Sequence, residues 1–178
     1  MCCYDARMIG WDQAARAWVV THRHAALDGV MWMLSVIGRG GMVWLALGAL
    51  AAWRRSRWQD FVRLAVALIC ATFVADHVLK PAVHRTRPFI VTPAVRVIGG
   101  LPNDPSFPSG HAANAFAAAL VLSVVTPAGR LAWWPLAVAI AYSRVCLGVH
   151  YPLDVAGGAC VGLGSAGIVL FARRRLRS

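Results

Sequence analysis

The 178-residue sequence contains no glutamate and only one lysine, Lys80, among its 18 basic residues. Its acidic side chains are seven aspartates, so the formal net charge is +11. This small number of carboxylates leaves little material for the oxygen-rich site of an ordinary two-metal phosphatase. The lone lysine among seventeen arginines also singles out Lys80 as a residue that needs an explanation.

The N-terminus lacks the basic start and apolar stretch of a signal peptide, so we expect no cleavage and insertion directed by the first spanning helix. The five cysteines show no spacing typical of a disulfide framework. We interpret them as small apolar side chains. No internal repeat or flexible linker is evident, which predicts a single domain over residues 1–178.

Long apolar runs dominate the sequence, in which 59% of residues are hydrophobic. They cover residues 27–53, 60–80, 109–126, 131–147 and 153–172. Because about 20 helical residues cross a bilayer, we predict an all-α integral membrane bundle of about five transmembrane helices, with its core in residues 27–173. Glycines at positions 38, 40 and 41 make the first run either one bent span or two short helices.

Residues 1–26 are predicted to form an interfacial N-terminal helix. In the part from 11 to 24, one helical face carries apolar side chains, whereas Asp12, Arg16 and Arg23 fall largely elsewhere. The apolar positions are Trp11, Ala15, Trp18 and Val19. This pattern is typical of a helix that lies on a membrane, although a soluble tail is the alternative.

The basic residues gather beside the apolar runs and form no stripe on a polar domain, which argues against binding nucleic acid. One cluster contains Arg54, Arg55 and Arg57, and a second contains Arg173, Arg174, Arg175 and Arg177. Placing both clusters in the cytoplasm, as the positive-inside bias requires, puts the loop 81–108 and the link 148–152 together on the outer face.

The outer loop carries positive charge against this bias, at His84, Arg85, Arg87 and Arg96. Lys80 ends the helix that precedes the loop. A lysine at the end of a spanning helix often has no functional role and simply extends its ammonium group to the membrane–water interface, which is the alternative explanation for Lys80. A second outer segment, Ser-Phe-Pro-Ser-Gly-His at residues 106–111, opens a helix and has the composition of an anion-binding N-terminus, although an ordinary helix cap is the alternative.

The third segment, residues 143–154, ends one spanning helix with Arg144 and starts the next near Pro152. Proline in the first turn places Asp154 roughly at the third helical position, from which its carboxylate can reach back toward His150. A carboxylate bonded to one ring nitrogen fixes the tautomer and leaves the other nitrogen free to attack.

The motifs K-P-A-V-H-R-T-R-P, P-S-G-H and S-R-V-C-L-G-V-H-Y-P-L-D occur in this order over about residues 76–154. In all three motifs and their spacing the sequence resembles the type 2 phosphatidic acid phosphatase superfamily, which includes vanadium haloperoxidases. The resemblance implies that His150 is a nucleophile that forms a phosphohistidine, that Asp154 orients it, and that His111 is the general acid.

The resemblance further implies that Lys80, Arg87 and Arg144 bind the substrate phosphate, with Ser109 and the Gly110 backbone N–H as additional donors. From its spacing we add that Asp76, one turn before Lys80, holds the ammonium group in place. His22, His24, His77 and His84 fall on no signature position of the family and need no catalytic role.

We therefore expect a metal-independent lipid phosphatase without a cofactor, in a bacterial inner membrane with its site facing the periplasm. The expected substrate is a polyprenyl diphosphate or a polyprenyl-phosphoryl sugar phosphate, and phosphatidylglycerol phosphate or phosphatidic acid is the alternative. A vanadate-dependent haloperoxidase and a non-catalytic protein that binds or transports lipid are the remaining alternatives. The sequence gives no indication of the oligomeric state.

Overall fold

The computed structural model describes residues 6–92 and 96–175, and within them the chain forms helices and loops without a strand. Cys2, Cys3 and the side chains of the second arginine cluster lie outside the described part. The elements are α1 (Ala6–Thr21), α2 (Ala25–Ile37), η1 (Arg39–Gly41), α3 (Met42–Arg55), α4 (Trp58–Thr72), η2 (Phe73–Leu79), α5 (Lys80–Val83), α6 (Pro88–Val91), α7 (Gly110–Val125), η3 (Pro127–Gly129), α8 (Arg130–Cys146) and α9 (Pro152–Arg175). The predicted all-α bundle is confirmed.

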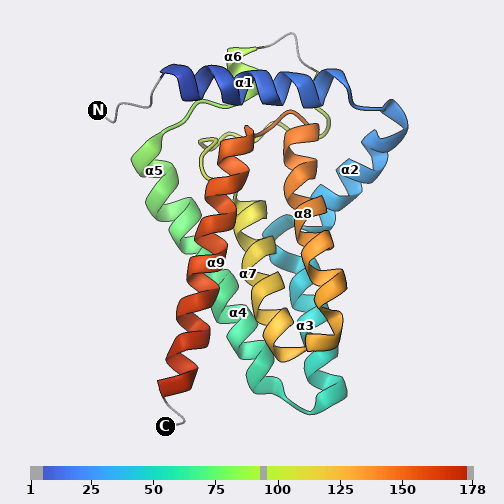
Figure 1. Cartoon of the computed structure of the whole chain (residues 1–178), viewed down its shortest axis with the longest axis vertical. Helices are drawn as coiled ribbons and strands as arrows, with labels where there is room; N and C mark the ends of the chain where they lie inside the picture. Colours follow the sequence, from blue (N-terminus) through green and yellow to red (C-terminus); the bar gives the residue numbers. More distant parts are fainter. Residues whose placement is uncertain (1–5, 93–95, 176–178) are drawn as a thin grey trace.

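Helix α7 occupies the middle of the bundle and packs against α4, α8 and α9 (Figure 1). Its buried face is rich in alanine, and the facing side of α9 carries glycine. A Cβ atom at Gly158 would lie 2.3 Å from the Ser109 carbonyl oxygen, and one at Gly162 would lie 2.1 Å from that of Ala113. These small residues let the two backbones approach closely, which brings the start of α7 next to the start of α9.

The first apolar run is broken into α2 and α3, which are bent by 53° at the short element η1. Gly40 and Gly41 adopt φ angles of 59° and 74°, in the left-handed region that glycine tolerates without steric cost. Of the two alternatives for residues 27–53, the structure therefore has two short helices joined by a sharp bend.

By length and hydropathy, two described stretches are able to cross a membrane, Trp58–Val91 and Pro152–Ala172. A third is added if the bent pair of α2 and α3 is counted as one span, whereas Gly110–Val125 is apolar but shorter. These criteria support two to three spans, fewer than the five that we predict from the sequence.

Helix α1 lies across one end of the bundle, and the loop after α5 and the α8–α9 link lie at this same end (Figure 1). The first arginine cluster, which ends α3 and continues into the turn before α4, lies at the opposite end, with the end of α9. Trp11 and Trp18 are each 63% exposed, whereas Asp12 and Arg16 are buried. The tryptophan face of α1 thus points outward and its polar face toward the bundle.

Candidate active site

A cavity of about 430 Å³ opens among the segments that meet below α1. It brings together side chains from all three motifs, together with two aspartates. These lining residues include Asp76, Lys80, Arg87, Asp104, Gly110, His111, Arg144 and His150. With Arg39, which also lines the cavity, four basic side chains therefore face the same small space as two histidines.

His150 lies in the α8–α9 link and is only 2% exposed. Gly148, with a φ of 79°, turns the chain after α8, and the His150 backbone N–H donates to the Arg144 carbonyl. The Nε2 atom is 3.3 Å from Arg87 Nη1. Because a guanidinium group only donates, Nε2 acts as the acceptor and the ring proton resides on Nδ1.

The charge state of His150 follows from its surroundings. Burial lowers the pKa of the imidazole, the nearby Asp154 carboxylate raises it, and Arg87 and Arg144 lower it further, to about 4. The ring is therefore neutral at neutral pH, and Nε2 carries a lone pair toward which the Arg87 N–H is directed.

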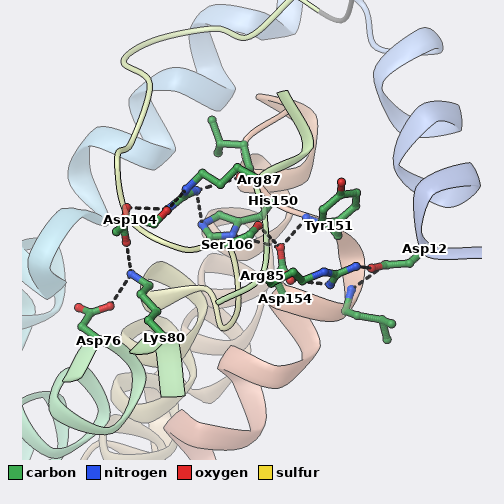
Figure 2. A network of polar contacts seen from close by, with 12 residues as sticks. Asp12, Asp76, Lys80, Arg85, Arg87, Asp104, Ser106, His150, Tyr151 and Asp154 are labelled. Atoms are coloured by element: carbon green, nitrogen blue, oxygen red, sulfur yellow. Dashed lines mark hydrogen bonds and ion pairs between the residues drawn. The ribbon is translucent and has the colours of Figure 1, made fainter. Parts of the chain in front are cut away.

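Asp154 is the third residue of α9 and is fully buried. Its Oδ2 atom lies 3.4 Å from His150 Nδ1, within ion-pair distance, and Nδ1 makes no hydrogen bond among the described residues. The same oxygen accepts bonds from Ser106 Oγ and from the backbone N–H of Tyr151, the latter at 2.9 Å. These bonds hold the carboxylate beside the imidazole (Figure 2).

Arg87 is buried and makes four contacts. Its Nε and Nη2 donate to the Asp104 carbonyl and carboxylate at 2.7 and 2.8 Å, and its Nη1 donates to the Val149 carbonyl at 2.9 Å besides facing His150. The guanidinium is thereby fixed against the imidazole.

Lys80 forms ion pairs with Asp76, at 2.5 Å, and with Asp104. Asp76 lies in η2, a π-helical stretch, which is a distortion often found at functional sites. Asp104 therefore bridges Lys80 and Arg87 (Figure 2). Burial raises the pKa of Asp104, but the Lys80 hydrogen bond and the Arg87 charge outweigh burial and lower it to about 2.

The start of α7 contributes Gly110 and His111 to the cavity, whereas Ser109 does not line it. The Ser109 hydroxyl makes no hydrogen bond to the first turn of α7 and is buried without a partner among the described residues. The Ser109 backbone N–H donates to the Asp154 carbonyl at 2.9 Å. The serine therefore ties the start of α7 to α9, and its side chain does not cap the helix.

His111 and Arg144 share one anchor on α2. His111 Nε2 lies 3.0 Å from the Ser35 carbonyl oxygen, and Arg144 Nη1 donates to the Ser35 hydroxyl. A carbonyl only accepts, so the His111 proton is on Nε2 in this arrangement. Ser35 thus orients two of the motif residues.

Several residues at the site were given no role in our reading of the sequence. Arg85 is notable in the sequence only as a charge in the outer loop, and Ser106 only as the first residue of its segment, whereas Asp104 carries no sequence signal of its own. Ser35 had no sequence signal, because its contacts reach residues 76 and 109 positions away. The four histidines that hold no signature position are exposed: His22, His24, His77 and His84.

Comparison with known proteins shows one family. The sequence profile described as the PAP2 superfamily matches residues 60–177. An undecaprenyl-diphosphatase of Sulfolobus acidocaldarius is 34% identical over 142 residues, which cover 78% of this chain and 66% of that protein. A decaprenylphosphoryl-5-phosphoribose phosphatase of Mycobacterium tuberculosis is 38% identical over 140 residues, which cover 73% of this chain and 70% of that protein. The chain thus spans about two thirds of the length of these relatives.

Solved structures have the same fold. The transmembrane PAP2-type phosphatidylglycerolphosphate phosphatase of Bacillus subtilis superposes with a TM-score of 0.79 at 24% identity, over 97% of this chain and 89% of that one. The crystal structure of Aquifex aeolicus LpxE superposes with a TM-score of 0.74 at 29% identity, over 88% of this chain and 93% of that one. A bacterial vanadium-dependent iodoperoxidase superposes with a TM-score of 0.77 at 17% identity, over 96% of this chain and 50% of that one.

The three motifs meet in one cavity, on a fold shared with membrane phosphatases and with a vanadium peroxidase. The profile match covers more than half of the sequence, and relatives above 30% identity agree with it. The chain therefore belongs to the PAP2 superfamily of membrane phosphatases, which confirms the family resemblance that its motifs predict.

Proposed function

We propose that this chain hydrolyses a polyprenyl diphosphate or a polyprenyl-phosphoryl sugar phosphate through a covalent phosphohistidine at His150. The observation that carries the proposal is the position of His150 Nε2, which is unprotonated and faces Arg87 in a cavity that Lys80 and Arg144 also line. The relatives named for these two activities supply the substrate class.

In the first step, Nε2 of His150 attacks the terminal phosphorus and forms the N–P bond. The bond that breaks is the one to the bridging oxygen of the diphosphate, which leaves with the polyprenyl monophosphate, or the one to the sugar oxygen of the sugar phosphate. Lys80, Arg87 and Arg144 neutralise the charge on the equatorial oxygens, which is the main requirement of phosphoryl transfer. His111 gives a proton to the departing oxygen. Because Nε2 keeps its proton on the Ser35 carbonyl, the transferred proton leaves from Nδ1, and His111 therefore acts as an imidazolium that is protonated on both nitrogens when the substrate phosphate is bound.

In the second step, water attacks the phosphohistidine, the N–P bond breaks and inorganic phosphate leaves. By microscopic reversibility, His111 now accepts a proton from the water. The Asp154 carboxylate beside Nδ1 stabilises the positive charge that the His150 ring carries while it is phosphorylated.

Metal independence forms part of the proposal. The cations that line the cavity can supply the charge that a metal ion provides in other phosphatases. Among the residues that the structure describes, no three His, Cys or acidic side chains are grouped to hold a metal ion.

The location of the lipid follows from the size of the cavity. A space of about 430 Å³ accommodates a phosphate or diphosphate headgroup, whereas a long polyprenyl chain has to stay in the bilayer. We place the cavity end of the bundle at the outer face of a bacterial inner membrane, because the first arginine cluster lies at the opposite end. We further propose that α8 and the shorter apolar helices complete about five crossings, with α1 at the interface.

The test is a screen of phosphate release in detergent, with chelator present, over polyprenyl diphosphates, a polyprenyl-phosphoryl sugar phosphate, phosphatidylglycerol phosphate and phosphatidic acid. We expect the highest kcat/KM for a polyprenyl substrate and no loss with chelator. A preference for the glycerolipids would overturn the substrate assignment.

Bromide or iodide oxidation that depends on added vanadate, without phosphate release, would favour the peroxidase alternative. Binding of polyprenyl diphosphate without any turnover would favour the non-catalytic one.

Asp104 competes with the substrate for two of its binding groups. Its carboxylate bridges Lys80 and Arg87 in the phosphate-free site, and a pKa of about 2 keeps it charged throughout the neutral range. We expect Asp104→Asn to lower the inhibitory concentration of orthovanadate by about three- to tenfold, since partly exposed ion pairs contribute up to about 1 kcal/mol. A higher inhibitory concentration would show instead that Asp104 is needed to hold the two cations in place.

A further inference from the structure

Asp12 is a buried charge on α1, far from the three motifs in sequence. Its side chain is fully buried. One oxygen, Oδ1, accepts from the Leu153 backbone N–H at 2.9 Å, and the other forms an ion pair with Arg85 Nη2. A buried carboxylate is costly unless its partners are well placed, and here both partners belong to segments of the site.

Arg85 joins Asp12 to the proposed catalytic residues. Its Nη2 contacts Asp12, its Nη1 donates to Asp154 Oδ1 at 2.6 Å, and its guanidinium lies 4.2 Å from the centre of the Tyr151 ring. Figure 2 shows the fork between the two carboxylates. The planar guanidinium suits such a two-sided contact, which an ammonium group would not reproduce.

The consequence for His150 lies in how the oxygens of Asp154 are used. Oδ1 is bound by Arg85, while Oδ2 faces the imidazole at 3.4 Å. As long as Asp12 shares the charge of Arg85, the pull of the guanidinium on Asp154 is divided between two carboxylates. If Asp12 did not pair with Arg85, the Asp154 carboxylate would be drawn toward the guanidinium. Asp154 would then orient the His150 imidazole less firmly.

We infer that Asp12 is a positioning residue, which acts through Arg85 and Asp154 to keep the His150 imidazole aligned for attack. The inference rests on the proposed function of His150. It makes α1 part of the active site: the outward face of this helix carries the exposed Trp11 and Trp18, and its inward face supports the nucleophile.

The test compares Asp12→Asn with the parent in steady-state phosphate release. Asparagine keeps an oxygen for the Leu153 N–H and removes only the charge. We expect kcat to fall about tenfold and KM to stay within twofold, because Lys80, Arg87 and Arg144 are unchanged. The matched control is Asp28→Asn, which removes the same charge from a partly exposed ion pair with Arg23 at 3.7 Å and should leave both constants at parent values.

A double-mutant cycle with Arg85→Gln separates positioning from general destabilisation. If Asp12 acts through Arg85, Asp12→Asn should change kcat less than twofold in the Arg85→Gln background. Additive losses, or a parent-like kcat for Asp12→Asn alone, would overturn the inference. A parent that releases no phosphate from any lipid would instead reject the proposed function.

Arg85→Lys covers the case in which Asp12→Asn does not fold. It keeps the positive charge but cannot bridge both carboxylates with a planar fork. We expect the same loss in kcat at unchanged KM, and a parent-like kcat would count against the inference.

Discussion

His150→Ala should reduce phosphate release to the uncatalysed background, a loss on the order of 10⁴-fold or more, while the bundle stays folded. The substitution removes the attacking nitrogen, and loss of a nucleophile is among the largest effects seen in enzymes. The core lies elsewhere, around α4, α7 and α8, so the apparent melting temperature should stay close to that of the parent. Initial rates with a polyprenyl diphosphate in detergent, together with a thermal scan, measure both quantities.

Rapid quenching with a substrate labelled at its terminal phosphate tests the intermediate directly. The parent should carry label on the protein during turnover, and His150→Ala should carry none. His24→Ala is the matched control, because His24 is exposed and forms no side-chain cap with α2. Turnover by His150→Ala at more than a few per cent of the parent rate would exclude a phosphohistidine at this position.

The general arrangement of the fold could be predicted because it depends on local patterns. Apolar runs interrupted by arginines predict helices and their ends, and the charge bias predicts that the outer loop and the α8–α9 link lie at one end, as Figure 1 shows. The position of Asp154 within α9 follows from Pro152, which favours the first turn of a helix. Each of these features needs only a few neighbouring residues.

The number of spans and the fine structure of the site could not be predicted in the same way. A run of apolar residues does not show whether Gly40 and Gly41 bend the chain or break it. The residues to which the side chains of Asp12, Arg85 and Ser35 are hydrogen-bonded are 69 or more positions away, so no periodicity in the sequence indicates them. Asp12 itself was placed on the polar face of an interfacial helix, which is consistent with solvent exposure as well as with a buried ion pair.

His111→Ala should slow the reaction according to the leaving group. Departure of a sugar alkoxide needs a proton in the transition state, whereas an acidic phenol leaves without one. The loss in kcat should therefore approach about 10³-fold for a polyprenyl-phosphoryl sugar phosphate and about tenfold for an aryl phosphate. The measurement is kcat for a series of phosphate esters whose leaving groups differ in acidity. A plot of log kcat against leaving-group pKa should be steeper for His111→Ala than for the parent.

Asn114→Ala is the matched control for this series. Asn114 also lines the cavity from α7, but it holds the Thr72 hydroxyl and has no proton to give at neutral pH. Any loss on its substitution should be the same for every leaving group, because only the shape of the cavity changes. Parallel plots for His111→Ala and the parent would assign His111 a binding role, and the Ser35 carbonyl would then serve to hold a donor to the phosphate oxygens.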